Sequence, residues 1–226
     1  MNFEQLGRRY LGTAAKTYDD ARTNREKWAS EQRIVEDLLA RLPAGSSVVD
    51  IPVGTGRFVD AYHRLHLVPT GMDISPDMIA IAARKAREVG LVMPLHVADI
   101  RHIDAADGAF DAVVCICFLN WVDRHGARTA LRELVRVARQ SLIIGLRHYV
   151  PFRQLQPATP EGFLEWSLQL AARAHKAVNA DSLRVHEEAD IVGMFREFGL
   201  VVRCQVRVMP RKYGTDYCIY MLEKFR

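Results

Sequence analysis

The hydrophobic and polar positions follow two different periods through the middle of the chain. Short, nearly continuous apolar runs are typical of strands that are buried on both faces. We expect such strands at residues 48–51, 67–72, 94–98, 110–118 and 141–146. Between these runs, apolar residues recur every three or four positions, which is typical of amphipathic helices. Strands that alternate with helices predict an α/β fold in which a parallel sheet carries helices on both faces.

The two ends of the chain differ from this alternating middle. Before it, helical spacing covers residues 3–18, which include Tyr10 and Tyr18, and about 25–42. After Tyr149, several prolines indicate a loop, which a helical insert, a closing helix and two β-rich stretches follow. We expect a single domain over 1–226, with segments at 1–44, 45–149, 150–186 and 187–226.

Composition and charge narrow the class of protein. The chain has 226 residues, 49% hydrophobic and 26% charged, which favours a folded globular protein over a disordered one. No apolar run approaches the ~20 residues of a membrane-spanning helix, and no secretory leader is recognised at the start, so we expect no membrane partner. The four cysteines show no zinc spacing, so we expect no metal, and reduced thiols fit a cytoplasmic protein.

The formal net charge of +4 comes from scattered basic residues rather than from a stripe. A stripe of Lys and Arg is the usual mark of a nucleic-acid surface. The densest group comprises Arg203, Arg207, Arg211 and Lys212. This group is either a solvated strand face or a region that attracts an anionic substrate.

A glycine turn and two carboxylates follow the first three strands. Gly54 and Gly56 come after Asp50, Asp73 ends the second strand and Asp99 ends the third. In open α/β sheets, ligands bind at the carboxyl ends of the strands, and a carboxylate about 20 residues past the glycines can accept both ribose hydroxyls. Each aspartate alone is equally well explained as a helix cap or turn residue. A nicotinamide-binding fingerprint is disfavoured, because Val59 stands where its third glycine belongs.

This stretch resembles the class I S-adenosylmethionine-dependent methyltransferases, and in particular those that act on small molecules. Their first motif is two hydrophobic residues followed by Asp-x-Gly-x-Gly-x-Gly; Val48-Val49-Asp50 and Gly54-x-Gly56 match it, with Pro52 in place of the first glycine. Residues 71–78, 98–100 and 110–114 are similar to the second, third and fourth motifs. Because proline has no N–H, we expect a cofactor to contact the backbone of Val53 and Gly54 instead.

The resemblance implies a Rossmann-like, mainly parallel sheet of seven strands in the order 3-2-1-4-5-7-6, with strand seven antiparallel. It also implies an N-terminal helical lid and a helical insert after strand 5. The implied cofactor is S-adenosylmethionine, with S-adenosylhomocysteine as product. The cofactor-binding residues it implies are Tyr18, Asp50, Val53, Gly54, Gly56, Asp73, Ile74, Met78, Asp99, Ile100 and Phe118.

Candidates for catalysis and acceptor binding follow strands four and five. His148 is the first candidate for a general base, because an unperturbed imidazole titrates near pH 6.5, and Tyr149 is the second catalytic candidate. The candidate acceptor-binding residues are Asn120, Trp121, Arg147, Phe163 and Trp166. Core packing or a surface salt bridge is the alternative for each of these side chains.

We expect transfer of the methyl group to an O or N atom of a small-molecule acceptor. A protein or RNA methyltransferase and a non-catalytic, cofactor-binding partner subunit are the alternatives. The sequence after strand four, Leu119-Asn120-Trp121-Val122, lacks the paired prolines common in adenine methyltransferases, so nucleic acid is not a favoured partner.

Overall fold

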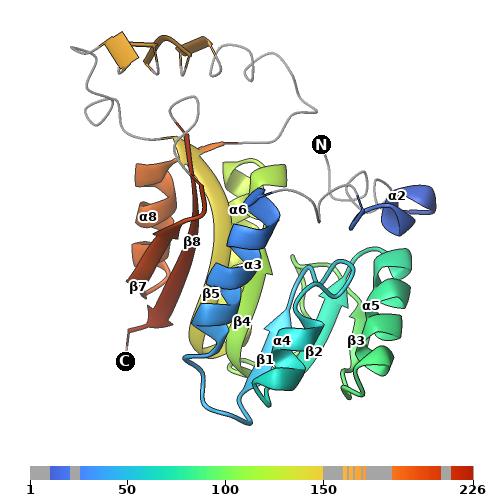
Figure 1. Ribbon diagram of the computed structural model, residues 1–226. Coiled ribbons are helices and arrows are strands. Elements are labelled where there is room, and N and C mark those ends of the chain that lie inside the picture. The colour runs from blue at the N-terminus through green and yellow to red at the C-terminus, as the bar shows by residue number, and fades with distance from the viewer. Residues whose placement is uncertain are drawn as a thin grey trace.

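The computed structural model describes residues 11–20, 26–149, 160–161, 163–164, 166–168, 170–171, 185–209 and 215–225 (Figure 1). Tyr10, Arg211, Lys212 and most of the predicted insert lie outside the described residues. Within the described residues, no helix combines the length and the apolar character that crossing a bilayer requires.

One mixed sheet forms the centre of the molecule. Its strands are β1 (Ser47–Asp50), β2 (Val68–Asp73), β3 (Leu95–Val97), β4 (Phe110–Ile116), β5 (Ala138–Tyr149), β6 (His186–Glu187), β7 (Leu200–Arg207) and β8 (Thr215–Lys224). The order is β3-β2-β1-β4-β5-β8-β7, and β8 runs antiparallel to both of its neighbours. The predicted order and the one antiparallel strand are confirmed. The short β6, which pairs with the end of β5, is an addition that the sequence did not predict.

Helices cover both faces of this sheet. They are α3 (Glu26–Leu39), α4 (Val59–Arg64), α5 (Pro76–Glu88), α6 (Arg124–Val137) and α8 (Glu188–Glu197). The short α2 (Thr13–Lys16) contacts α5 instead, and a 3-10 turn, η1, spans Leu119–Trp121. One core lies between the sheet and α6 with α8, and the other between the sheet and α3 with α4. Successive residues of β4 serve different cores, because Val113 belongs to the first and Val114 to the second. This explains why β4 reads as an unbroken apolar run.

Strand β5 is longer than the sequence predicted, and the candidate catalytic residues lie within it. We expected a strand over 141–146 with His148 and Tyr149 beyond its end, but β5 continues to Tyr149. The extension is paired on both sides, with His148 opposite Asp216 of β8 and opposite His186 of β6. His148 and Tyr149 are therefore part of the sheet rather than beyond the end of the strand.

Candidate functional site

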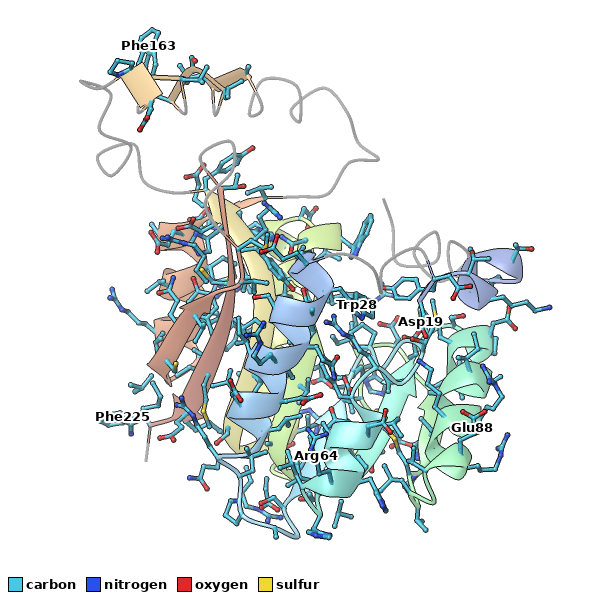
Figure 2. All side chains as sticks on the ribbon, in the orientation of Figure 1. Asp19, Trp28, Arg64, Glu88, Phe163 and Phe225 are labelled. Atoms are coloured by element: carbon cyan, nitrogen blue, oxygen red, sulfur yellow. The ribbon has the colours of Figure 1, made fainter. Side chains whose placement is uncertain are left out.

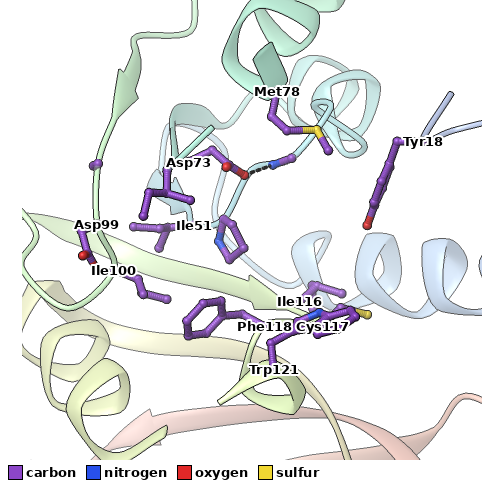
Figure 3. Close-up of a pocket in the computed structure, with 14 residues that line it drawn as sticks. Tyr18, Ile51, Asp73, Met78, Asp99, Ile100, Ile116, Cys117, Phe118 and Trp121 are labelled. Atoms are coloured by element: carbon purple, nitrogen blue, oxygen red, sulfur yellow. Dashed lines mark hydrogen bonds between the residues drawn. The ribbon is translucent and has the colours of Figure 1, made fainter. Parts of the chain in front are cut away.

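A pocket lies at the carboxyl ends of β1, β2 and β4 (Figure 3). The residues that line it are Tyr18, Ile51, Pro52, Gly54, Asp73, Ile74, Met78, Ala98, Asp99, Ile100, Ile116, Cys117, Phe118 and Trp121. The predicted carboxylates Asp73 and Asp99 thus meet in one pocket with Gly54, as the edge-of-sheet argument requires. Most of the remaining lining is apolar, so the pocket suits a flat, largely apolar group with a polar rim.

Asp73 holds the glycine turn in place. Its Oδ2 accepts the Gly54 N–H at 2.9 Å, and its Oδ1 accepts the Ser75 N–H at 2.9 Å (Figure 3). The Ser75 hydroxyl in turn caps α5 by accepting the Met78 N–H at 3.3 Å. Burial raises the pKa of Asp73, and the backbone hydrogen bonds oppose that rise. The carboxylate oxygens keep further lone pairs, which can accept hydroxyl donors of a ligand.

The two glycines of the turn have different surroundings. Gly54 has φ +55°, and a Cβ there would point into open space. Gly56 has φ +73°, and its Cβ would lie 3.0 Å from the Cα of Ala82 in α5. Gly56 lines neither this pocket nor the one described below, so its place in the structure is explained by close packing of the turn on α5. We expected a cofactor to contact the backbone of Val53. Instead, the Val53 N–H donates to the Met72 carbonyl at 2.8 Å, so this donor is already used within the chain.

Asp50 lies below the turn, where it is 2% exposed. Its Oδ2 accepts the Tyr62 hydroxyl at 2.9 Å. Burial, with a smaller contribution from the charge of Asp73, raises the pKa of Asp50 to about 7, although the Tyr62 hydrogen bond opposes the rise. The Asp50 carboxyl therefore titrates near neutral pH.

Asp99 lies at the opposite, more exposed end of the pocket. Its carboxylate accepts from the Arg101 backbone N–H at 2.8 Å and pairs with the Arg101 guanidinium at 2.5 Å. Burial alone favours the neutral form, but the hydrogen bonds and charge of Arg101 outweigh it and lower the pKa of Asp99. Asp99 is consequently an ionised acceptor at neutral pH.

A second pocket continues from the first and shares five lining residues with it. The shared residues are Tyr18, Pro52, Gly54, Ile116 and Cys117. The second pocket adds Lys27, Trp28, Glu31, Asp50, Val53, Thr55, Arg57 and Phe58. It is the more charged of the two, because carboxylates and cations line it together.

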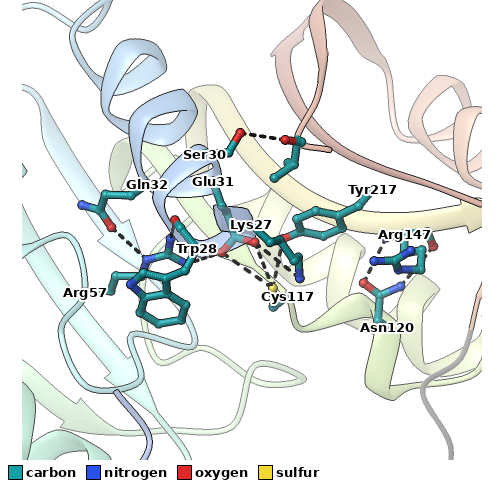
Figure 4. Close-up of polar contacts among 11 residues, drawn as sticks. Lys27, Trp28, Ser30, Glu31, Gln32, Arg57, Cys117, Asn120, Arg147 and Tyr217 are labelled. Atoms are coloured by element: carbon teal, nitrogen blue, oxygen red, sulfur yellow. Dashed lines mark hydrogen bonds and ion pairs between the residues drawn. The ribbon is translucent and has the colours of Figure 1, made fainter. Parts of the chain in front are cut away.

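Arg57 is the central cation of the second pocket (Figure 4). Its guanidinium lies 3.6 Å from the ring centroid of Trp28 and forms an ion pair with Glu31, which is buried. Its Nε donates to Gln32 Oε1 at 2.8 Å. The sequence pattern does not indicate this cluster, although Arg57 follows Gly56 directly. Its partners come from α3, some 25 residues earlier, and nothing in the local pattern connects the two segments.

Cys117 lies where the two pockets join, directly after β4. It has φ +64°, and its Sγ is 2.9 Å from the Tyr217 hydroxyl of β8. Burial raises the pKa of Cys117 to about 11 and raises that of Tyr217 well above its ordinary value. Both groups are therefore protonated at neutral pH, and Cys117 is not a thiolate nucleophile.

The N-terminal segment 11–20 is tied to the glycine turn and to α5. Asp19 Oδ1 accepts the Thr55 hydroxyl at 2.7 Å, and Asp19 Oδ2 pairs with Lys85 at 2.6 Å. The Gly12 N–H donates to Asp77 Oδ2 at 2.6 Å. These contacts place Tyr18 against both pockets, in keeping with the position we expected for it.

His148 and Tyr149 line neither pocket. His148 is 1% exposed, and its Nε2 lies 2.8 Å from the Tyr220 hydroxyl. Burial lowers the pKa of His148. Tyr149 is also buried. The assignment of His148 as general base is not supported by this placement, because the ring is buried on a face of the sheet against Tyr220, which packs on Phe195 of α8.

The candidate acceptor-binding residues separate into three groups. Trp121 lines the first pocket. Asn120 instead holds η1 to β5, because its amide donates to the Arg147 carbonyl and accepts the Arg147 N–H, both at 3.0 Å. Phe163 and Trp166 contact each other at 5.8 Å between ring centroids and line neither pocket. Figure 2 shows Phe163 far from Asp19 and Trp28.

Comparison with known proteins connects this geometry to a family. The family model for a methyltransferase domain matches residues 48–141, the stretch that carries β1 to β5 and the pocket carboxylates. The match covers less than half of the chain, and it shows that these residues are similar to methyltransferase domains. The chain is similar to a dTDP-4-amino-2,3,4,6-tetradeoxy-D-glucose N,N-dimethyltransferase of Saccharopolyspora spinosa, with 31% identity over 51% of this chain and 45% of that protein. The chain therefore spans less than half the length of this relative.

Solved structures share the fold of this chain. Magnesium protoporphyrin IX methyltransferase from Synechocystis, crystallised with bound S-adenosylhomocysteine, superposes with a TM-score of 0.76 over 99% of this chain and 100% of that chain, at 16% identity. The [4+2]-cyclase SpnF superposes with a TM-score of 0.72 over 98% and 96%, at 19% identity. One fold thus serves different reactions, so the reaction has to be argued from the site.

Proposed function

We propose that this protein transfers a methyl group from S-adenosylmethionine to an O or N atom of a small-molecule acceptor. The observation that carries the proposal is the meeting of Gly54, Asp73 and Asp99 in one pocket at the carboxyl ends of adjacent strands. A sequence match to methyltransferase domains over the same residues supports it.

The residues of the two pockets fit the two halves of the cofactor. The first pocket offers the Asp73 carboxylate for ribose hydroxyls, ionised Asp99 for an adenine amino group, and the apolar Ile74, Ile100 and Phe118 for the adenine ring. The second pocket carries charges of both signs, among them Asp50 and Arg57. An amino-acid group bears an ammonium and a carboxylate, so opposite charges in one pocket suit it.

In this assignment the chain contributes position and exclusion of water rather than a reactive side chain. S-adenosylmethionine supplies an electrophilic methyl group on a sulfonium. Tyr18, Phe118 and Trp121 line the pocket with aromatic surface that keeps water away from the reacting atoms. Holding acceptor and methyl group close and aligned is worth ~7–11 kcal/mol. Burial keeps Cys117 and Tyr217 protonated, so neither acts as a base at neutral pH.

The state of the four cysteines fits a protein that is located in a reducing compartment. All four are free thiols, and Cys115 and Cys218 are buried. We propose a cytoplasmic protein on this ground.

Calorimetric binding of S-adenosylhomocysteine tests the proposed function. The wild-type protein should bind it, and Asp73→Asn, which keeps one acceptor oxygen, should bind at least tenfold more weakly because a buried carboxylate–hydroxyl contact is lost. Asp60→Asn is the matched control, since Asp60 is exposed on α4 and should leave affinity unchanged. No binding to the wild-type protein contradicts the proposal, and equal affinity for Asp73→Asn removes the ribose assignment.

A further inference from the structure

Among the buried and half-buried arginines, Arg147 stands out because it has no acidic partner among the residues that the structure describes. Its Nη1 donates to the Thr215 hydroxyl at 2.9 Å, and its guanidinium carbon lies 5.8 Å from the Tyr217 ring centroid. Within the part of the chain that the structure describes, no carboxylate lies within ion-pair distance of it. By contrast, Arg57 and Arg136 each pair with a glutamate. A half-buried cation without a counter-ion is costly, and a guanidinium has five donors to satisfy.

A second cation approaches the same aromatic ring from another element. Lys27 of α3 places its Nζ 4.2 Å from the Tyr217 ring centroid. Its nearest carboxylate is Glu31 at 3.8 Å, which is already in an ion pair with Arg57. Figure 4 shows Lys27 and Arg147 at different sides of the Tyr217 ring. Two cations from distant parts of the sequence therefore converge on one ring.

This pair of cations borders the proposed methyl-transfer site. Tyr217 is fixed by its contact with Cys117, which lines both pockets. The backbone of Arg147 is fixed by Asn120, and the residue after Asn120, Trp121, lines the first pocket. The cations thus lie beside the end of the pocket where Cys117 and Trp121 meet, away from Asp73 and Asp99.

We propose that the methyl acceptor carries an anionic group, which Arg147 binds with support from Lys27, while an apolar part of the acceptor lies against Trp121. This inference rests on the proposed function and names the chemical class of its acceptor. A carboxylate and a phosphate both accept two parallel hydrogen bonds from a guanidinium, so either group satisfies the donors that Arg147 leaves unused. The acceptor's negative charge would also offset the charge of Arg147, for which the described residues supply no carboxylate.

Equilibrium binding to the complex with S-adenosylhomocysteine tests the inference with three probes: benzoate, phenyl phosphate and neutral benzamide. At least one anion should bind tenfold or more tightly than benzamide, and the tighter of the two identifies the preferred group. Arg147→Gln should abolish this preference while leaving affinity for S-adenosylhomocysteine unchanged, which shows that the variant is folded. Arg139→Gln is the control, because Arg139 is an exposed arginine paired with Asp111.

The outcomes separate this inference from the proposed function. If S-adenosylhomocysteine binds but neither anion is preferred over benzamide, only the anionic acceptor is overturned. The same holds if Arg147→Gln retains the full preference. If the wild-type protein does not bind S-adenosylhomocysteine, the proposed function fails, and the inference fails with it.

Discussion

Replacing Asp50 by asparagine should raise the stability of the protein relative to wild type as the pH increases from 5 to 8, although Asp50 lies at the centre of the first sequence motif. Burial raises the pKa of this carboxyl from 3.8 to about 7. Between about pH 4 and pH 7 the native state therefore holds a proton that the unfolded chain has released. Stability must fall as the pH rises through that window.

The magnitude follows from the position of the two pKa values. Each pH unit spent between them costs about 1.36 kcal/mol, so the wild-type protein loses about 3 kcal/mol from this group between pH 5 and pH 8. The asparagine that replaces Asp50 carries no charge at either pH and still accepts the Tyr62 hydroxyl, which lies 2.9 Å from Asp50 Oδ2. The burial of its unpaired amide donors costs about 1–3 kcal/mol at both pH values and cancels in the comparison.

Urea denaturation of wild type and Asp50→Asn at pH 5 and pH 8 measures this difference. The stability of the variant relative to wild type should rise by about 3 kcal/mol between the two pH values. Asp111→Asn is the control, because hydrogen bonds from Ser47 lower the pKa of Asp111. The contribution of Asp111 to stability is therefore complete above about pH 4 and does not change from pH 5 to pH 8. An Asp50→Asn difference that is equal at the two pH values refutes the reasoning.

Two further predictions concern the segments that surround the pocket. Gly56→Ala should lower the midpoint of thermal unfolding by several degrees more than Gly54→Ala. Only the Cβ added at Gly56 would come close to the backbone of Ala82, at 3.0 Å from its Cα. Equal shifts of the two midpoints in calorimetry would contradict the packing role of Gly56. Asp19→Ala should weaken S-adenosylhomocysteine binding about fivefold, corresponding to about 1 kcal/mol for its lost contacts, and should speed tryptic cleavage after Lys16. The exposed Asp20→Ala should do neither, and a similar effect from both variants would show that the contacts of Asp19 are not what docks this segment.

The parts of this molecule that sequence reasoning predicted depend on local periodicity and on the geometry of parallel sheets. The apolar runs located the first five strands; β1, β4 and β5 are largely buried, whereas β3 is half-buried to exposed. Asp73 and Asp99 were expected in one site because the carboxyl ends of parallel strands share an edge, and the structure places both in the first pocket. The strand order came from the family resemblance rather than from the pattern.

What sequence reasoning could not predict depends on contacts between distant segments. The end of β5 is paired with β8 and β6, which begin some 40 residues or more after Ser141, so the strand extends past the predicted end at 146 and includes His148. The Arg57 cluster depends on α3 packing against the turn after β1. Burial of Asp50 against Tyr62 likewise requires the folded turn, and no single-sequence pattern reports it.

The contacts around the glycine turn determine which groups of the site are left to bind a ligand. Val53 and Gly54 donate their N–H groups to Met72 and Asp73, and Asp19 joins the turn to α5. These contacts are made within the chain itself and hold the backbone of the turn, so few of its N–H groups are left to bind a ligand. A preformed turn reduces the conformational entropy that binding must offset. Because the N–H groups of Val53 and Gly54 are already used, recognition in the proposed site falls to side chains, above all to the carboxylates of Asp73 and Asp99 and to Arg57.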